Sequence, residues 1–350
     1  MLVNLTQQLL RGESLDTVQT ERAVQELIAD RVSVEAKAEF LTALAQKGET
    51  VEEIAAFARV LREKSIVPVL DDATRAAEIL DVVGTGGDQV GTFNISTTVA
   101  ILCAAAGVKV AKHGNRAVTS QTGSADVLEA LGIRIDLPPA EAAKALVQQG
   151  FAFFFAPNYH PAFKHIVPAR KLCAERKQRT IFNIIGPLLN PARPSAQLLG
   201  VARPELCEPM ARVLQSLGVR RGMVVCGQGT AESSQPICFD ELSTLGQNHI
   251  AEFYQDRGFS VSTLSPASFP LQPATLADLR GGDKFANAEI IRQILRGDER
   301  GPKRDAVLLN AGAALFVAGK ARSLAEGWEL AATVIDGGAA TRKLMALTGA

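Results

Sequence analysis

The sequence predicts an α/β protein with a small, all-helical lobe and a large lobe built on a mostly parallel central sheet. At 350 residues the chain exceeds the usual size of one domain. Residues 1 to about 70 show only the three- and four-residue apolar spacing of helices. From Ile79 onward, short β-rich runs alternate with helical segments, which is the pattern of a sheet covered by helices on both faces.

The N-terminal helices have recognisable ends. In SVEAKAEFLTALAQKG, Ser33 is in position to N-cap a helix and Gly48 to end it. Thr50 and Glu53 then form the S/T-x-x-E pattern of a capping box, which opens the next helix. The preceding segment SLDTVQTERAVQELI has helical spacing as well. These signals predict a helical bundle at the start of the chain.

The remainder of the chain is expected to alternate strands with helices. The runs predicted as strands are ILDVVG (79–84), VKVAKHG (108–114), IRIDLP (133–138), FAFFFAP (151–157), GMVVCG (222–227) and DAVLLNA (305–311). The helical patterns between them include 95–107, 122–132, 139–150 and 204–218.

One segment interrupts the alternation. Residues 160–191 hold helical patterns without a strand, and we expect them to fold back onto the N-terminal helices. The predicted small lobe is therefore discontinuous and comprises residues 1–72 and approximately 160–190. The large lobe comprises residues 73–159 and 191–350.

Composition and charge exclude several classes of protein. Lys plus Arg equals Asp plus Glu, 37 each, so no global field attracts nucleic acid. Five scattered cysteines without a CxxC pair argue against a disulfide framework or a thiolate zinc site. The first residues lack an apolar signal core, and the longest apolar run, Val99 to Val108, is too short to span a bilayer. We expect a cytoplasmic protein with no membrane contact.

The segment DVVGTGGDQVGTFNIST, Asp81 to Thr97, predicts an anion-binding loop between a strand and a helix. It is neither a G-x-G-x-x-G fingerprint, because Gln89 takes the sixth position from Gly84, nor a P-loop, because Thr92 follows Gly91 where lysine is required. Its glycines let backbone N–H groups approach a ligand closely. An ordinary tight turn is the alternative for the glycines alone.

A second polar loop follows the next predicted strand. It carries Lys112, His113, Asn115, Arg116, Thr119, Ser120 and Ser124. Two such loops on neighbouring strands would face each other at one sheet edge and supply cations, hydroxyls and amides to a ligand with several phosphates. A solvated edge is the alternative for Lys112 and Arg116, and an ordinary loop histidine for His113.

An acidic pair, Asp240 and Glu241, lies beside Ser243 in CFDELSTLG. Adjacent carboxylates can hold magnesium at a phosphate site. A solvent-exposed pair is the alternative, so the metal interpretation depends on the two phosphate loops.

These motifs together resemble one known family. GTGGD, NIST, KHGNRAVTSQTGSADVLEALG, HPAFKH, RTIFNIIGPLLNP and DEL, in this order, resemble anthranilate phosphoribosyltransferase. The likeness runs from about Lys47 to NAGAALFVAGKARSLAEG. It implies a homodimer with a nucleoside phosphorylase/phosphoribosyltransferase-like fold. It also implies transfer of a phosphoribosyl group from 5-phosphoribosyl 1-pyrophosphate to the amine of anthranilate, a step of tryptophan synthesis, with two Mg²⁺ ions.

The resemblance also implies residue roles. No side chain acts as a nucleophile; Lys112 stabilises the leaving pyrophosphate and His113 has a supporting role. The implied donor-binding residues are Gly84, Gly87, Asp88, Thr92, Asn94, Ile95, Ser96, Thr97, Lys112, His113, Gly114, Asn115, Arg116, Ala117, Val118, Thr119, Ser120 and Ser124. The implied anthranilate contacts are Gly84, Asn115, Arg170 and Gly186, and the implied metal ligands are Ser96, Asp240 and Glu241.

Three departures from the family pattern keep other functions open. The segment after Arg170 and the segment before Asp240 are longer than the family's, and Phe163 stands where methionine is common. A same-fold transferase with another aromatic acceptor is therefore the first alternative. A non-enzymatic relative that binds nucleic acid through a basic groove is the second, and a nucleoside phosphorylase is a weaker third.

Overall fold

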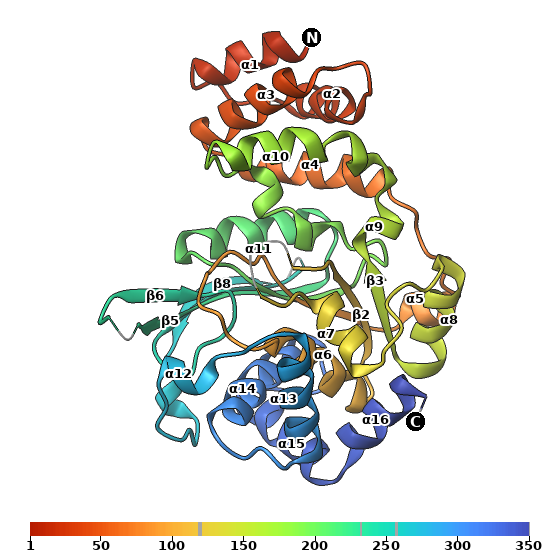
Figure 1. Cartoon of the computed structure of the whole chain (residues 1–350), viewed down its shortest axis with the longest axis vertical. Coiled ribbons are helices and arrows are strands. Elements are labelled where there is room, and N and C mark those ends of the chain that lie inside the picture. The colour runs from red at the N-terminus through yellow and green to blue at the C-terminus, as the bar shows by residue number, and fades with distance from the viewer. Residues whose placement is uncertain (118–120, 232, 256–257, 350) are drawn as a thin grey trace.

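The computed structural model describes residues 1–117, 121–231, 233–255 and 258–349. Figure 1 shows a small helical lobe at the top and a larger α/β lobe below it, with the N-terminus in the first and the C-terminus in the second. The predicted fold class is confirmed. Among the described residues, no helix is both long and apolar enough to cross a membrane.

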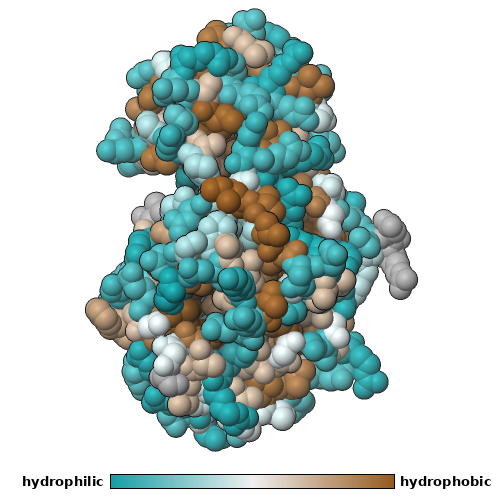
Figure 2. All heavy atoms as spheres, turned by 90° about the vertical axis from the view of Figure 1, so that its right-hand side faces the viewer, coloured by the Kyte–Doolittle hydropathy of each residue, from teal (hydrophilic) through white to brown (hydrophobic). Residues whose placement is uncertain are grey.

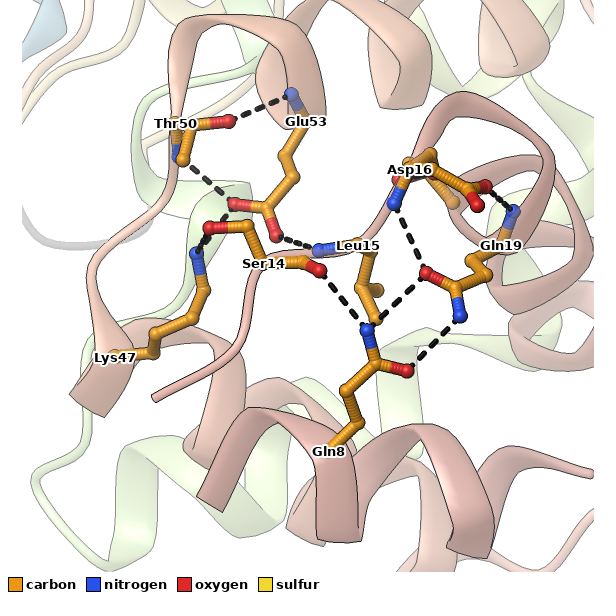
Figure 3. A network of polar contacts seen from close by, with 9 residues as sticks. Gln8, Ser14, Leu15, Asp16, Gln19, Lys47, Thr50 and Glu53 are labelled. Atoms are coloured by element: carbon orange, nitrogen blue, oxygen red, sulfur yellow. Dashed lines mark hydrogen bonds and ion pairs between the residues drawn. The ribbon is translucent and has the colours of Figure 1, made fainter. Parts of the chain in front are cut away.

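The small lobe is a helical bundle. It contains α1 (Leu2–Leu10), α2 (Thr17–Ile28), α3 (Val34–Lys47) and α4 (Val51–Glu63). The predicted caps are confirmed: Ser33 Oγ accepts from Ala36 N–H, and Thr50 and Glu53 form a reciprocal capping box. Figure 3 shows Glu53 at the centre of a polar network that also joins the α1–α2 connection to α3.

The interrupting segment lies against this bundle. It forms η1 (Pro161–His165), α10 (Val167–Glu175), η2 (Ile181–Asn183) and η3 (Gly186–Leu189), and contains no strand. Helix α10 packs on α3, and η3 packs on α4. These are the contacts that a discontinuous small lobe requires; its exact boundaries stay a prediction.

Among the described residues, the large lobe is built on one sheet of eight strands in the order β3-β2-β1-β4-β5-β7-β8, with β6 paired to β5. Pairing is parallel from β3 through β5 and antiparallel beyond it. The strands are β1 (Ile79–Gly84), β2 (Lys109–Gly114), β3 (Phe151–Phe155), β4 (Ala196–Gly200), β5 (Arg221–Thr230), β6 (Pro236–Phe239), β7 (Asn248–Tyr254) and β8 (Gly258–Leu264).

Helices cover both faces of this sheet. In Figure 1, α6 and α13–α16 lie below the sheet, and α11 lies between the sheet and the small lobe. The helices of this lobe are α5 (Asp72–Ala76), α6 (Ile95–Ala105), α7 (Ser124–Leu131), α8 (Pro139–Gln149), α9 (Ala156–Tyr159), α11 (Cys207–Ser216), α12 (Leu276–Leu279), α13 (Lys284–Arg296), α14 (Pro302–Val317), α15 (Leu324–Asp336) and α16 (Ala339–Thr348), with short turns η4 (Pro204–Leu206) and η5 (Pro266–Ser268).

Two strand predictions are wrong. Residues 305–311 belong to helix α14, which is buried on nearly all sides and therefore reads as a continuous apolar run. Residues 133–138 form an irregular connection whose Ile133 and Ile135 fill the core without a strand partner. The strands β4, β6, β7 and β8 were not predicted.

The connection between the lobes exposes apolar side chains. Residues 64–71 link α4 to α5, with Ile66 N–H bonded to Tyr159 C=O at 2.9 Å. Val69 is 90% exposed. Figure 2 shows hydrophobic residues gathered in a stripe that crosses the junction of the lobes on this side of the molecule.

Candidate functional site

The candidate site lies where the parallel strands end. Strands β1 and β2 are neighbours, so the loops that follow Gly84 and Gly114 lie side by side, as predicted. Each loop leads into a helix, α6 after the first and α7 after the second. The carboxyl edge of an open parallel sheet is the usual place for a ligand.

Backbone geometry explains the glycines of the first loop. Gly86, Gly87 and Gly91 have φ of 73°, 83° and 76°, a region that side chains with a Cβ rarely adopt. Gly84 is required for another reason, because a Cβ there would lie 2.2 Å from Asp240 Oδ2. The loop therefore combines left-handed turns with a close approach to the acidic pair.

The backbone of the first loop and of α6 holds the acidic pair in place. Gly86 N–H donates to Asp240 Oδ2 at 2.6 Å, and Ser96 N–H donates to Glu241 Oε1 at 3.3 Å. The residues before Asp240 include the β5–β6 hairpin, which projects away from the sheet in Figure 1. This segment therefore leaves the acidic pair at the two loops.

The charges of the acidic pair are not balanced by their surroundings. Burial, together with the nearby Asp88 carboxylate, raises the pKa of Asp240 to about 8. Burial and the Asp240 charge hold the pKa of Glu241 well above its ordinary value. Glu241 Oε2 is buried and has no hydrogen-bond partner among the described residues. This cluster of Asp88, Asp240 and Glu241 has the donor chemistry of a divalent-cation site.

The protein alone does not complete a metal site. Within the described ranges, no group of three or more His, Cys, Asp or Glu side chains has a metal-binding arrangement. Mg²⁺ typically takes one or two protein carboxylates and completes its shell with water and substrate phosphates. The residues fit magnesium that arrives with a phosphorylated ligand.

Lys112 supplies a buried cation beside the carboxylates. Its Nζ donates to Val82 C=O at 2.7 Å and to Ser96 Oγ at 3.4 Å. Burial lowers the pKa of Lys112 to about 8, although the Asp81, Glu241 and Asp240 charges oppose that shift. The ammonium group thus lies at the start of α6, where phosphate oxygens would find a cation and helix N–H groups together.

Asp81 was not predicted as a site residue. It is buried within β1, where Asn190 Nδ2 donates to its Oδ2 at 2.9 Å. Burial raises its pKa to about 6, and the Lys112 charge opposes the rise. A charged residue inside the apolar run ILDVVG was the available signal.

In the second loop, Ser124 and Asn115 lie together, whereas Arg116 is paired with carboxylates of α7. Ser124 Oγ donates to Asn115 C=O at 3.4 Å, so the start of α7 closes onto the loop. Arg116 is engaged by Asp126 and Glu129, each at 3.0 Å, on the surface of α7. Arg116 therefore needs to leave these carboxylates to reach a ligand. The predicted residues Val118, Thr119 and Ser120 lie outside the described residues.

Of the other residues predicted for the donor, Asp88 and Thr92 lie in the first loop, and Ile95 and Thr97 lie in the first turn of α6. Asp88 Oδ1 accepts from Val90 N–H at 3.2 Å, and Thr92 forms an isolated bridge with Arg280. Thr97 Oγ1 is buried without a partner among the described residues. Arg179 reaches across from the segment after α10 and donates to Gly87 C=O at 3.2 Å. Thr97 thus has a buried hydroxyl without a described partner in the first turn of α6, and Arg179 links the interrupting segment to the first loop.

An aromatic row extends from Lys112 toward the small lobe. The rings of His113 and His160 lie 5.3 Å apart, and His160 and Phe163 lie 5.4 Å apart. The row continues to Phe182, whose ring faces the Arg170 guanidinium at 5.3 Å. Arg170, predicted to contact the acceptor, therefore lies at the far end of this aromatic row. His160 and Phe182 were missed, although HPAFKH and RTIFN were noted as motifs.

Both histidines are neutral. Burial lowers the pKa of His160 to about 4. Burial and the nearby His160, Arg62 and Lys112 hold the pKa of His113 well below its ordinary value, opposed by a hydrogen bond with the Gly186 backbone. Gly186 thus touches the row through its main chain, and a Cβ there would meet no atom within 4 Å.

The fold and the site define a two-lobed glycosyl transferase. A family model described as "Glycosyl transferase family, a/b domain" matches residues 76–341, and one described as "Glycosyl transferase family, helical bundle domain" matches residues 3–65. The chain is 50% identical over 318 residues to an anthranilate phosphoribosyltransferase of Geobacter sulfurreducens, covering 88% of this chain and 87% of that protein.

Solved structures agree with this relationship. An anthranilate phosphoribosyltransferase of Thermus thermophilus superposes with a TM-score of 0.86 at 41% identity, covering 99% of this chain and 98% of that one. The enzyme of Saccharomyces cerevisiae in complex with PRPP and Mg has a TM-score of 0.85 at 26% identity, with 99% and 97% coverage. The chain belongs to the anthranilate phosphoribosyltransferase family.

Proposed function

We propose that this protein transfers the phosphoribosyl group of 5-phosphoribosyl 1-pyrophosphate to the amine of anthranilate, giving N-(5-phosphoribosyl)anthranilate and pyrophosphate in tryptophan biosynthesis. The observation that carries the proposal is that Glu241 and Lys112 both contact Ser96 at the start of α6, while Asp240 beside them is bound by Gly86 of the first loop. Family membership gives the acceptor its identity.

Magnesium is the proposed cofactor, with two ions per site. Asp240, Glu241 and Ser96 would hold it, and the partnerless Glu241 Oε2 supports this role. When bound, magnesium offsets negative charge on the pyrophosphate as it leaves. The rest of the donor site is proposed to consist of the glycine loop, the N–H groups at the start of α6, and the hydroxyls of Ser96 and Thr97.

The acceptor is proposed to lie along the aromatic row. Arg170 can bind the anthranilate carboxylate through two parallel N–H groups, a geometry that a guanidinium offers and an ammonium does not. Burial lowers the pKa of Arg170, so a carboxylate partner would restore a favourable environment for its charge. Asn115 is proposed to contact the acceptor from the donor side.

The reaction needs no protein nucleophile. The amine of anthranilate is neutral at pH 7, so its lone pair can form the new C–N bond as the bond to pyrophosphate breaks, and the nitrogen then releases one proton. Lys112 and backbone N–H groups then stabilise the charge of the leaving group, and the two loops fix the reactants relative to each other. The neutral His113 has a supporting role at the wall between the two substrates.

The function is tested by measuring pyrophosphate release with magnesium, the donor and a panel of aromatic amines. We expect turnover with anthranilate that requires both substrates and the metal. Activity with another amine and none with anthranilate would identify a same-fold transferase with a different acceptor. Salt-sensitive binding of DNA without any turnover would favour the non-enzymatic alternative.

We further propose that the protein forms a homodimer through the small lobe. Exposed apolar side chains on its first two helices support this: Val3, Leu10 and Val18 are each more than half exposed. Surfaces of this kind are typical of subunit interfaces. Sedimentation should give the mass of a dimer, and Leu10→Lys should shift the protein toward the monomer.

A further inference from the structure

A closed ring of hydrogen bonds connects the two phosphate loops to a third segment, the turn that precedes α13. Gly282 N–H donates to Asn287 Oδ1 at 2.7 Å, and Asn287 Nδ2 donates to Asn94 Oδ1 at 2.9 Å. Asn94 Nδ2 donates to Thr122 C=O at 3.2 Å, and Thr122 Oγ1 donates back to Gly282 C=O at 2.9 Å. The ring therefore joins residues 94, 122, 282 and 287.

Backbone groups fix the direction of every bond in the ring. The Gly282 N–H can only donate, so it must meet the oxygen of the Asn287 amide and leave the nitrogen to face Asn94. Asn94 must then present its own oxygen to Asn287 and its nitrogen to Thr122 C=O, which can only accept. Each amide has a single orientation that satisfies both neighbours.

The third segment is docked tightly on the first loop. Gly281 N–H donates to Gly91 C=O at 3.0 Å, and Phe93 N–H donates to Leu279 C=O at 3.2 Å. A Cβ at Gly281 would lie 2.7 Å from Asn287 Oδ1 and 2.8 Å from Phe93 Cα. Asn287 itself is 2% exposed on α13. The segment is thus a rigid support for the end of the donor loop.

The ring also determines what Asn94 offers to a ligand. Its side-chain oxygen is occupied by Asn287, and one of its two amide protons is occupied by Thr122. The second amide proton donates to no described residue. In this orientation Asn94 is a hydrogen-bond donor toward the site, which suits a phosphate oxygen.

We propose that Asn287 is a positioning residue for the phosphoribosyl pyrophosphate site. It holds the first and second loops at a fixed separation and sets the Asn94 amide so that its free N–H faces the pyrophosphate. The inference rests on the proposed function for the identity of the ligand. Neither Asn287 nor Thr122 is among the residues predicted to touch a substrate.

The test compares Asn287→Asp with a matched control on the same helix, Gln293→Glu, which makes the same amide-to-carboxylate change on the exposed side of α13. Asn287→Asp still accepts from Gly282 but cannot donate to Asn94. We expect the donor KM, and the donor Kd from calorimetry with magnesium, to rise roughly tenfold, the loss of one buried hydrogen bond. The anthranilate KM should stay unchanged, and Gln293→Glu should behave as wild type.

A second pair of variants separates positioning from a general loss of structure. Thr122→Val removes the hydroxyl from the ring at nearly constant volume, and Thr122→Ser retains it. We expect Thr122→Val to raise the donor KM and Thr122→Ser to restore it. The double variant Asn287→Asp with Thr122→Val should lose less than the product of the single effects, because both act through Asn94.

The outcomes are distinguishable. A wild-type protein that does not bind the donor in calorimetry contradicts the proposed function. A wild-type protein that binds the donor, combined with an Asn287→Asp variant of equal donor affinity, contradicts the positioning role. A rise in both substrate KM values by the same factor, with a lowered melting temperature, would make Asn287 a structural residue only and also overturns the inference.

Discussion

Two glutamates in this molecule differ in how completely their carboxylates are satisfied. Glu53, in the small lobe, accepts from Leu15 N–H, Thr50 N–H and Lys47 Nζ at 2.7–2.8 Å (Figure 3). Glu241, at the sheet edge, accepts only from Ser96 N–H at 3.3 Å, and its second oxygen has no described partner. The Glu53 carboxylate is therefore fully hydrogen-bonded within the protein, whereas the Glu241 carboxylate has one oxygen that a ligand can bind.

The difference separates structure from function. A buried carboxylate that is paired and hydrogen-bonded stabilises a fold, whereas one that is left partnerless is destabilising unless a ligand completes its shell. In the large lobe, burial disfavours the charged form of Glu241, and the like charges of Asp240 and Asp88 disfavour it further. The contrast between the two sites can be tested by removing each charge in turn.

The largest effect is expected at the acidic pair. Asp240→Asn combined with Glu241→Gln should reduce turnover roughly a thousandfold, because the metal that offsets the leaving charge is lost. The fold should be intact, since the change removes two mutually repelling charges. Steady-state kinetics measures the turnover, and thermal unfolding with and without magnesium and donor checks the fold. A near-normal rate at limiting magnesium would contradict the metal role.

Glu53→Gln is the reciprocal experiment and should act on stability alone. The change leaves the Lys47 ammonium buried without its partner, which costs about 3–5 kcal/mol of unfolding free energy. Denaturant titration measures the loss, and turnover of the folded enzyme should be unchanged. Glu52→Gln, next to it on the exposed side of α4, is the matched control. If Glu53→Gln lost turnover while its stability was unchanged, the proposed difference between the two glutamates would be wrong.

Arg170→Ala should affect one substrate only. Loss of a charged, two-point contact with the acceptor carboxylate is expected to raise the anthranilate KM roughly tenfold to a hundredfold and to leave the donor KM unchanged. Steady-state kinetics with each substrate varied in turn measures both constants. If the donor KM alone rises, the assignment of the two pockets is wrong.

The fourth prediction concerns His160, whose effect is confined to low pH. Because the pKa of folded His160 is about 4, below the ordinary 6.5, the unfolded chain binds the additional proton as pH falls. Above pH 6.5, protonation of His160 therefore does not lower the free energy of unfolding. As pH falls toward 4, this free energy decreases by on the order of 3 kcal/mol in all. His160→Phe should flatten this part of the stability profile. If the urea midpoint changes with pH between pH 7 and pH 4 in the same way in wild type and in His160→Phe, this prediction is wrong.

The two polar loops at the sheet edge could be predicted from the sequence because their signals are local. The glycine loop and the KHGN loop each follow a predicted strand, NIST opens the helix after the glycine loop, and β1 and β2 are neighbours. The caps at Ser33 and Thr50 depend on residues three positions apart and were also predicted. Periodicity could not distinguish buried helix α14 from a strand, because its surroundings are apolar on nearly every side.

Long-range contacts were out of reach. The ring through Asn94 and Asn287 joins residues 193 positions apart, and neither amide has a local signal. The position of Asp240 against Gly84 was equally hidden, since the β5–β6 hairpin absorbs the additional residues before it. The roles of the individual site residues remain proposals for the variants above.

The two lobes share an interior. A single hydrophobic cluster runs from Leu61 of α4 through Leu188 of η3 and Met210 of α11 to Leu199 and Val224 on the sheet. Removing the first four helices would therefore expose the remaining apolar side chains of this cluster to water. The small lobe is consequently no detachable module: calorimetric melting should proceed as one cooperative event, and chimaeras between relatives should exchange α10, η3 and α11 together with the first four helices.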